Sequence, residues 1–225
     1  MSFSRAIAPK TGPGHDELTA AMVGIGMRFA ASGAVSPNIE DTLFFASEEG
    51  MDRDDLRTLA LLVTWFGVHS AWVNADRLTR LVKTRGSARV QAFWSALAGW
   101  QFKDRRFARL MALATKERIS VPSSASTFLV KRHGEDPRFE GSPIRVAANV
   151  LRDRIEDVLS PAELARIHRA YRNRVQMGPG YRADAWAALE ENPRLTASEV
   201  ARRTYASFAT AWQVRREFVI VNERR

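Results

Sequence analysis

The chain has 225 residues, a formal net charge of +9 and 45% hydrophobic residues, so it is expected to fold as one large or two small domains. The positive charge favours a polyanionic partner such as nucleic acid, although an arginine-rich background composition produces the same balance. The absence of cysteine excludes disulfides, thiolate nucleophiles and cysteine-type zinc sites, and fits a cytoplasmic protein. Apolar runs such as Leu59 to Val68 fall short of the ~20 residues of a membrane-spanning helix, so no membrane partner is expected.

The first half of the chain is predicted to be helical. Residues 1–15 contain prolines and glycines without periodicity, which predicts a flexible arm. Over residues 16–118, apolar side chains recur at helical spacing, which predicts a bundle of short helices. The helices are expected to begin at Asp16, Asn38, Asp52 or Arg53, Asn74, Ser87, and Lys103 or Asp104. The first should end at Gly33 and the second at Gly50.

Four tryptophans of this half, Trp65, Trp72, Trp94 and Trp100, stand within these helical patterns. Stacking on bases or lining a ligand pocket is one interpretation. Tryptophans at helical spacing are more often core residues, and that is the expectation here.

Residues 119–146 hold the densest cluster of proline, glycine and serine in the chain, which predicts a loop-rich connector and a domain boundary. Within it, Ser126–Val130 suits either a short strand or the start of a helix, and Pro143–Val146 suits a second strand. At most a small β-hairpin is expected there.

Residues 147–225 are predicted to form a second helical domain. A helical face is expected over Ala147–Val158, and Ser160 with Glu163 forms a capping box for a helix that should run to the Gly178-Pro179-Gly180 stop. A helix over Ala183–Glu191 follows. The predicted fold class is therefore all-α.

The segment from Asn192 to Arg216 suits two short helices separated by a tight turn. Thr196, with Glu199 three residues later, can cap the first helix, and Ser207 can cap the second. Five apolar residues fall where the two helices would pack together, namely Leu195, Val200, Ala206, Ala211 and Val214.

Over about residues 183–218 the chain resembles the helix-turn-helix superfamily of DNA-binding proteins, including its trihelical variants. The resemblance implies that the second helix is a recognition helix. Its outward, DNA-facing side would consist of Ser207, Phe208, Ala209, Thr210, Gln213 and Arg216. The resemblance departs at Tyr205, because the turn usually has glycine at a left-handed position where a side chain is strained.

The resemblance also implies roles for these side chains. Arg216 suits the edge of guanine and Gln213 the edge of adenine, because each can form bidentate hydrogen bonds there. Ser207, Thr210 and Arg215 would bind phosphates, and Arg202 and Arg203 of the first helix would lie near the DNA backbone.

The function expected from these features is sequence-specific binding of double-stranded DNA, by a transcriptional regulator or by a DNA-targeting component of a larger system. The protein would be cytoplasmic and located at the nucleoid when bound. The N-terminal helical domain would serve as a homodimer or partner-protein interface, because one recognition helix reads only a few base pairs. No cofactor or metal is expected, since the four histidines are scattered and phosphate-binding glycine motifs are absent from the sequence.

Three alternatives stay open. The C-terminal helices can complete a helical protein-interaction module, and burial of Phe208 and Trp212 with exposure of Gln213 and Arg216 would favour DNA readout over it. The basic helices can also serve RNA binding. A metal-dependent nuclease would use carboxylates such as Glu135 and Asp136, although these are more simply turn residues beside a proline.

Overall fold

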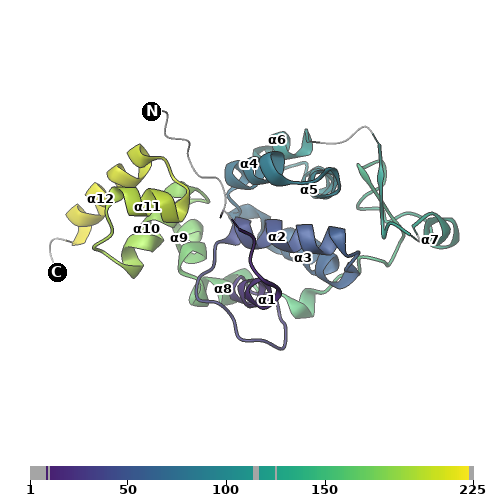
Figure 1. Cartoon of the computed structure of the whole chain (residues 1–225), viewed down its shortest axis with the longest axis horizontal. Helices are drawn as coiled ribbons and strands as arrows, with labels where there is room; N and C mark the ends of the chain where they lie inside the picture. Colours follow the sequence, from purple (N-terminus) through teal and green to yellow (C-terminus); the bar gives the residue numbers. More distant parts are fainter. Residues whose placement is uncertain (1–8, 10, 114–116, 125, 223–225) are drawn as a thin grey trace.

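The computed structural model describes residues 9, 11–113, 117–124 and 126–222, and these are mostly helical (Figure 1). The predicted all-α fold class is confirmed. Among the described residues, none of the helices combines the length and the apolar character that crossing a membrane requires. Most of the predicted arm, residues 1–8 and 10, lies outside the described part. The carbonyl oxygen of Pro9 accepts a hydrogen bond from Nη1 of Arg85 at 2.8 Å.

The N-terminal half is a bundle of short helices, as expected. The elements are α1 (His15–Gly24), α2 (Ile39–Asp52), α3 (Leu56–His69), η1 (Ser70–Trp72), α4 (Ala75–Arg85), α5 (Ala88–Trp100), η2 (Arg105–Phe107) and α6 (Ala108–Met111). Helix α2 contacts α1, α3, α4 and α5, so it stands at the centre of the bundle. Helix α3 is buried on all sides along its middle.

The predicted caps at Asn38, Asn74 and Ser87 are confirmed, since each side chain accepts a hydrogen bond from a backbone N–H of the first turn. The expected end of the first helix at Gly33 is wrong. Helix α1 ends at Gly24 because Gly26 takes φ +91° and Met27 then pairs with Val158 in a β-bridge.

The connector contains β1 (Ile119–Val121), α7 (Ser126–His133) and β2 (Ile144–Val146). The two strands pair in parallel, with Ile119 opposite Ile144 and Val121 opposite Val146. They therefore do not form the expected hairpin. Helix α7 lies between them in the chain, and a parallel pair needs such a crossover connection.

The helix expected over Ala147–Val158 is wrong. Ala147 forms a β-bridge with Glu135, residues 148–150 form a turn with Asn149 at φ 65°, and residues 151–154 are irregular before the short η3 (Ile155–Asp157). Leu151 and Val158 are nevertheless buried, whereas Ile155 is exposed. A loop thus brings the apolar side chains of this stretch to the bundle.

The helix predicted to start at Ser160 is two helices, α8 (Pro161–Ile167) and α9 (Arg169–Met177). The capping box of Ser160 and Glu163 is confirmed. The break occurs at His168, whose backbone is extended and whose ring Nδ1 accepts a hydrogen bond from the backbone N–H of Tyr171 at 3.1 Å. The chain ends with α10 (Tyr181–Glu191), α11 (Ala197–Thr204) and α12 (Phe208–Asn222).

The buried apolar residues form two clusters without a common member. The first extends from Leu18 to Tyr171, so residues 147–171 of the expected second domain pack with the N-terminal bundle. The second lies within α10–α12, which we call the three-helix unit. Figure 1 places this unit at one end of the molecule and α7 at the other.

Candidate nucleic-acid interface

The three-helix unit is built around a small apolar core. Each of α10, α11 and α12 contacts the other two. The core residues are Ala185, Ala188, Leu189, Leu195, Val200, Ala211, Val214 and Phe218, and the rings of Trp186 and Phe218 pack edge to face at 5.2 Å. The expected burial of Leu195, Val200, Ala206, Ala211 and Val214 is confirmed.

Both helices of the predicted motif begin at the expected residues. Thr196 and Glu199 form the capping box of α11. The Ser207 hydroxyl accepts a hydrogen bond from the backbone N–H of Thr210 at 3.1 Å, as an N-cap of α12 does. Three residues, 205–207, separate the two helices. This arrangement is the helix, short turn and helix that the spacing predicted.

Tyr205, the residue that departs from the resemblance, does adopt the left-handed conformation, with φ 57° and ψ 18°. A non-glycine residue is strained there. Its hydroxyl donates a hydrogen bond to Oδ2 of Asp41 at 3.1 Å, and its ring centroid lies 4.1 Å from the guanidinium carbon of Arg77. These contacts with α2 and α4 offset the cost of the turn.

The outward side of α12 is more apolar than a typical DNA-reading surface. Phe208, Trp212 and Ile220 are 58%, 52% and 60% exposed, and we call these three side chains the apolar stripe. Gln213 and Arg216 are exposed beside them, and the Arg216 guanidinium carbon lies 5.9 Å from the Trp212 ring centroid. Because Phe208 and Trp212 are not buried, the condition that would favour DNA readout over protein docking is not met.

Several polar side chains of the predicted interface already have intramolecular partners. The Ser207 and Thr210 hydroxyls lie 2.8 Å apart, and Nε of Arg215 donates to the carbonyl oxygen of Leu195 at 3.0 Å. The amide of Gln213 donates to Oε1 of Glu217 at 3.2 Å.

The two arginines at the end of α11 are in a different situation. Arg202 and Arg203 are exposed, and within the described part of the chain neither side chain has a hydrogen bond or an ion pair. They are therefore the cations near the turn that are most available to a phosphate.

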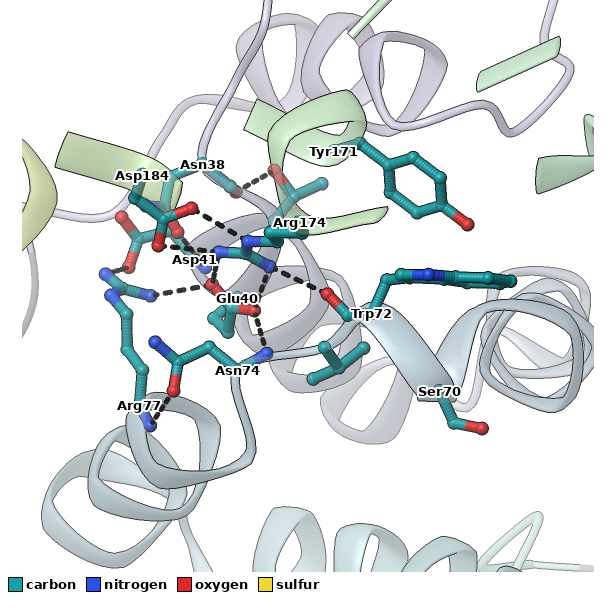
Figure 2. Close-up of polar contacts among 12 residues, drawn as sticks. Asn38, Glu40, Asp41, Ser70, Trp72, Asn74, Arg77, Tyr171, Arg174 and Asp184 are labelled. Carbon is teal, nitrogen blue, oxygen red and sulfur yellow. Dashed lines mark hydrogen bonds and ion pairs between the residues drawn. The ribbon is translucent and has the colours of Figure 1, made fainter. Parts of the chain in front are cut away.

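A buried group of charges, which sequence reasoning missed, lies between the three-helix unit and the bundle (Figure 2). We call it the ion cluster, and it consists of Glu40 and Asp41 of α2, Arg77 of α4, Arg174 of α9 and Asp184 of α10. Figure 2 shows the guanidinium of Arg174 between the carboxylates of Glu40 and Asp184. Its Nη1 lies 2.7 Å from Oε1 of Glu40, and its Nε lies 2.7 Å from Oδ1 of Asp184. Arg77 bonds to Asp41 at 2.7 Å.

Burial and the neighbouring charges both shift the pKa values of the three carboxyl groups of the ion cluster, and the net direction differs among them. Burial raises the pKa of Glu40, but Arg174, Arg77 and the backbone N–H of Asn74 outweigh it and hold that pKa below its usual range. Burial raises the pKa of Asp41, and Arg77 opposes this only in part. Burial likewise raises the pKa of Asp184 despite its bonds to Arg174.

The residues of the other interpretations are engaged in structural contacts. Glu135 pairs with Arg118, and Asp136 pairs with Arg138 at 2.6 Å. Trp65 and Trp94 are buried core residues, as expected, and their indole N–H groups donate to Ile25 and Ser47. Within the described residues, no group of three or more histidine, cysteine or acidic side chains has the arrangement of a metal site.

Comparison of the chain with protein-family models, curated proteins and solved structures gives no match. The functional interpretation therefore depends on the geometry described above.

Proposed function

We propose that the protein binds double-stranded DNA through the three-helix unit, as a transcriptional regulator or as a DNA-targeting component of a larger system. The observation that carries the proposal is the three-residue turn, with a left-handed first residue, that joins two capped helices packed on a third. Helix α12 lies at the outer end of the molecule, where its outward side is open to a major groove (Figure 1).

In this proposal some exposed side chains contact bases and others contact phosphates. Gln213 and Arg216 reach base edges, and Phe208 contacts the methyl group of thymine. Arg202, Arg203 and Arg215 bind phosphates, with Arg215 oriented by its bond to the Leu195 carbonyl. Ser207 and Thr210, which bond to each other, stabilise the start of α12 and place it against the backbone.

Fluorescence anisotropy with a labelled random duplex, at about 50 mM and about 200 mM salt, tests the proposal. About four phosphate contacts predict a loss of affinity on the order of 10²-fold over this range. Combined Gln213→Ala and Arg216→Ala substitutions should weaken binding by about tenfold or more. The matched control is Arg132→Ala, which removes an equal charge from exposed α7 at the opposite end of the molecule. Absence of binding at the lower salt would exclude this function, and preference for structured RNA would support the RNA alternative.

The apolar stripe favours one second candidate, which is association of two copies of this chain through α12. If two α12 helices pack antiparallel through their exposed sides, with the two-fold axis at the level of position 214, Phe208 of one copy faces Ile220 of the other. The same symmetry places Trp212 opposite Arg216, an aromatic ring against a cation. Sedimentation equilibrium would then give a dimer mass that Trp212→Glu reduces to the monomer mass and Arg132→Ala leaves unchanged.

A further inference from the structure

The contacts that join the three-helix unit to the rest of the chain include a set of polar bonds. Arg174 pairs with Asp184, the Tyr181 hydroxyl donates to Asp76 at 3.1 Å, and the Asn173 amide donates to Glu190 at 3.0 Å. The Tyr205 hydroxyl adds its bond to Asp41. The two apolar clusters share no residue. Interfaces between units that are polar in this way permit relative motion more readily than a shared apolar core does.

The chain connection between α9 and α10 suits a hinge. It consists of Gly178, Pro179 and Gly180, and Gly178 takes φ +89°. A side chain placed at either glycine would meet nothing within 4 Å. Small rotations at these residues therefore meet no side chain at the connection itself, although α9 and α10 on either side of it pack closely against each other.

Tyr205 completes the ion cluster from the side of the three-helix unit. The cluster contains three carboxyl groups and two guanidinium groups, so its acidic groups outnumber its basic ones. The neutral hydroxyl of Tyr205 donates a hydrogen bond to Asp41 without adding a further negative charge. Nε and Nη1 of Arg77 are buried and have no hydrogen-bond acceptor among the described residues. The Tyr205 ring lies against this guanidinium at 4.1 Å, where its negative face attracts the charge.

We propose that Tyr205 is a latch, a positioning residue that holds the three-helix unit on the N-terminal bundle and thereby sets the orientation of α12. When Tyr205 leaves Asp41 and Arg77, the end of the unit that carries the α11–α12 turn moves away from α2 and α4, while the core of the unit and the Arg174–Asp184 pair near Gly178–Gly180 stay intact. The state of α2 and α4 is thus coupled to the direction in which α12 points. The latch does not require that α12 binds DNA, and it goes beyond that function.

The absence of native cysteine allows a direct test, because two introduced cysteines are the only labelling sites. Nitroxide labels at Thr84→Cys on α4 and Ser198→Cys on α11 are both at exposed helical positions. Electron spin resonance then measures the distribution of label distances in full-length protein without DNA. The parent should give one narrow distribution, and Tyr205→Gly should give a broad or double one.

The choice of glycine makes the result decisive. Glycine suits the left-handed turn better than tyrosine does, so a purely local role of Tyr205 predicts an unchanged or narrower distribution for Tyr205→Gly. That outcome would overturn the latch. Tyr205→Phe, which keeps the ring over Arg77, should broaden the distribution less than Tyr205→Gly does.

Circular dichroism checks that the helices of the variant are intact. If Tyr205→Gly loses helix, the double variant Asp41→Leu, Arg77→Met decides, because it removes both partners of Tyr205 in the bundle and leaves the turn unchanged. Broadening in the folded double variant supports the latch, and a narrow parental distribution contradicts it. The label distances are measured without DNA and test only the latch, whereas the anisotropy titration tests only DNA binding. Failure of one proposal is therefore distinguishable from failure of the other.

Discussion

The hydroxyl of Tyr205 lies 3.1 Å from Oδ2 of Asp41, a carboxylate 164 residues earlier in the chain. A residue in the turn between α11 and α12 is therefore held by two buried charged side chains of the N-terminal bundle, Asp41 and Arg77. The left-handed backbone of Tyr205 is tolerated because of this long-range contact.

Removal of the Tyr205 hydroxyl should destabilise the protein moderately. Tyr205→Phe loses one hydrogen bond to a charged group, which is worth about 1.5 kcal/mol of unfolding free energy. Tyr205→Leu should cost more, because the buried Nε and Nη1 of Arg77 also lose the aromatic ring. Urea denaturation measures both, and equal losses in the two variants would show that the ring contributes nothing.

Arg174 is the central cation of the ion cluster, and its removal should be severe. Arg174→Ala leaves Glu40 and Asp184 buried without their partner, at a cost of about 3–5 kcal/mol. Arg174→Lys should restore little, since one ammonium cannot make the paired bonds to both carboxylates. The control is Arg172→Ala, a neighbour whose side chain is 45% exposed and pairs with Glu190 at 3.3 Å. Its loss should stay below about 1 kcal/mol in the same denaturation experiment.

Two buried histidines predict a loss of stability in mild acid. Burial lowers the pKa of both His69 and His168 from 6.5 to about 4. The hydrogen bonds agree with neutral rings, since Nδ1 of His168 accepts from Tyr171 and Nε2 donates to the carbonyl oxygen of Pro37. The unfolded chain binds these protons first, so stability is complete above pH 6.5 and falls as pH drops towards about 4. The largest loss of unfolding free energy from this effect is about 3 kcal/mol for each histidine.

Urea titrations between about pH 7 and about pH 5 measure this slope. This pH range matters because burial raises the pKa of Asp41 and Asp184. Protonation of these two carboxyl groups in stronger acid favours the folded chain, and it would offset the loss of stability that the histidines cause. His168→Asn retains a side-chain oxygen that can cap α9 but removes one titrating ring. A slope as steep as in the parent would show that His168 does not contribute.

Replacement by alanine should affect the stability of the protein far more at Trp94 than at Trp212. Trp94→Ala removes a fully buried ring and its bond to Ser47, and should cost about 3–5 kcal/mol of unfolding free energy. Trp212→Ala changes a half-exposed surface residue and should alter stability by at most about 0.5 kcal/mol. It should nevertheless weaken whichever interaction α12 makes, with DNA in the anisotropy titration or with a second copy in sedimentation. A loss of stability without any binding effect would assign Trp212 to the structure of the unit.

Local signals predicted much of this fold because they act over a few residues. Asn38, Ser160, Thr196 and Ser207 each cap a helix where the sequence indicated, since a cap needs only its own first turn. The helix expected over residues 147–158 failed for the opposite reason. Leu151 and Val158 are apolar at helical spacing, but the bundle buries them from a loop.

The ion cluster was beyond prediction from pattern alone. Arg174 shares α9 with Arg169, which is half-buried, and Arg172, which is exposed, and periodicity does not distinguish it from them. Asp184 offered a weak signal as an isolated acid among alanines. The exposure of Phe208 and Trp212 depends on how α12 rotates on its core, which the order of residues left open.

The bond between Glu40 and Arg174 spans 134 residues, and this has a consequence for synthesis on the ribosome. Helices α2 and α4 leave the exit tunnel long before Arg174 is made. Until then, of the partners that Glu40 has in the described part of the chain, only Arg77 and the backbone N–H of Asn74 are present, and we expect water to hydrate this carboxylate. The last third of the chain, when it arrives, both completes the bundle and attaches the unit that carries α12.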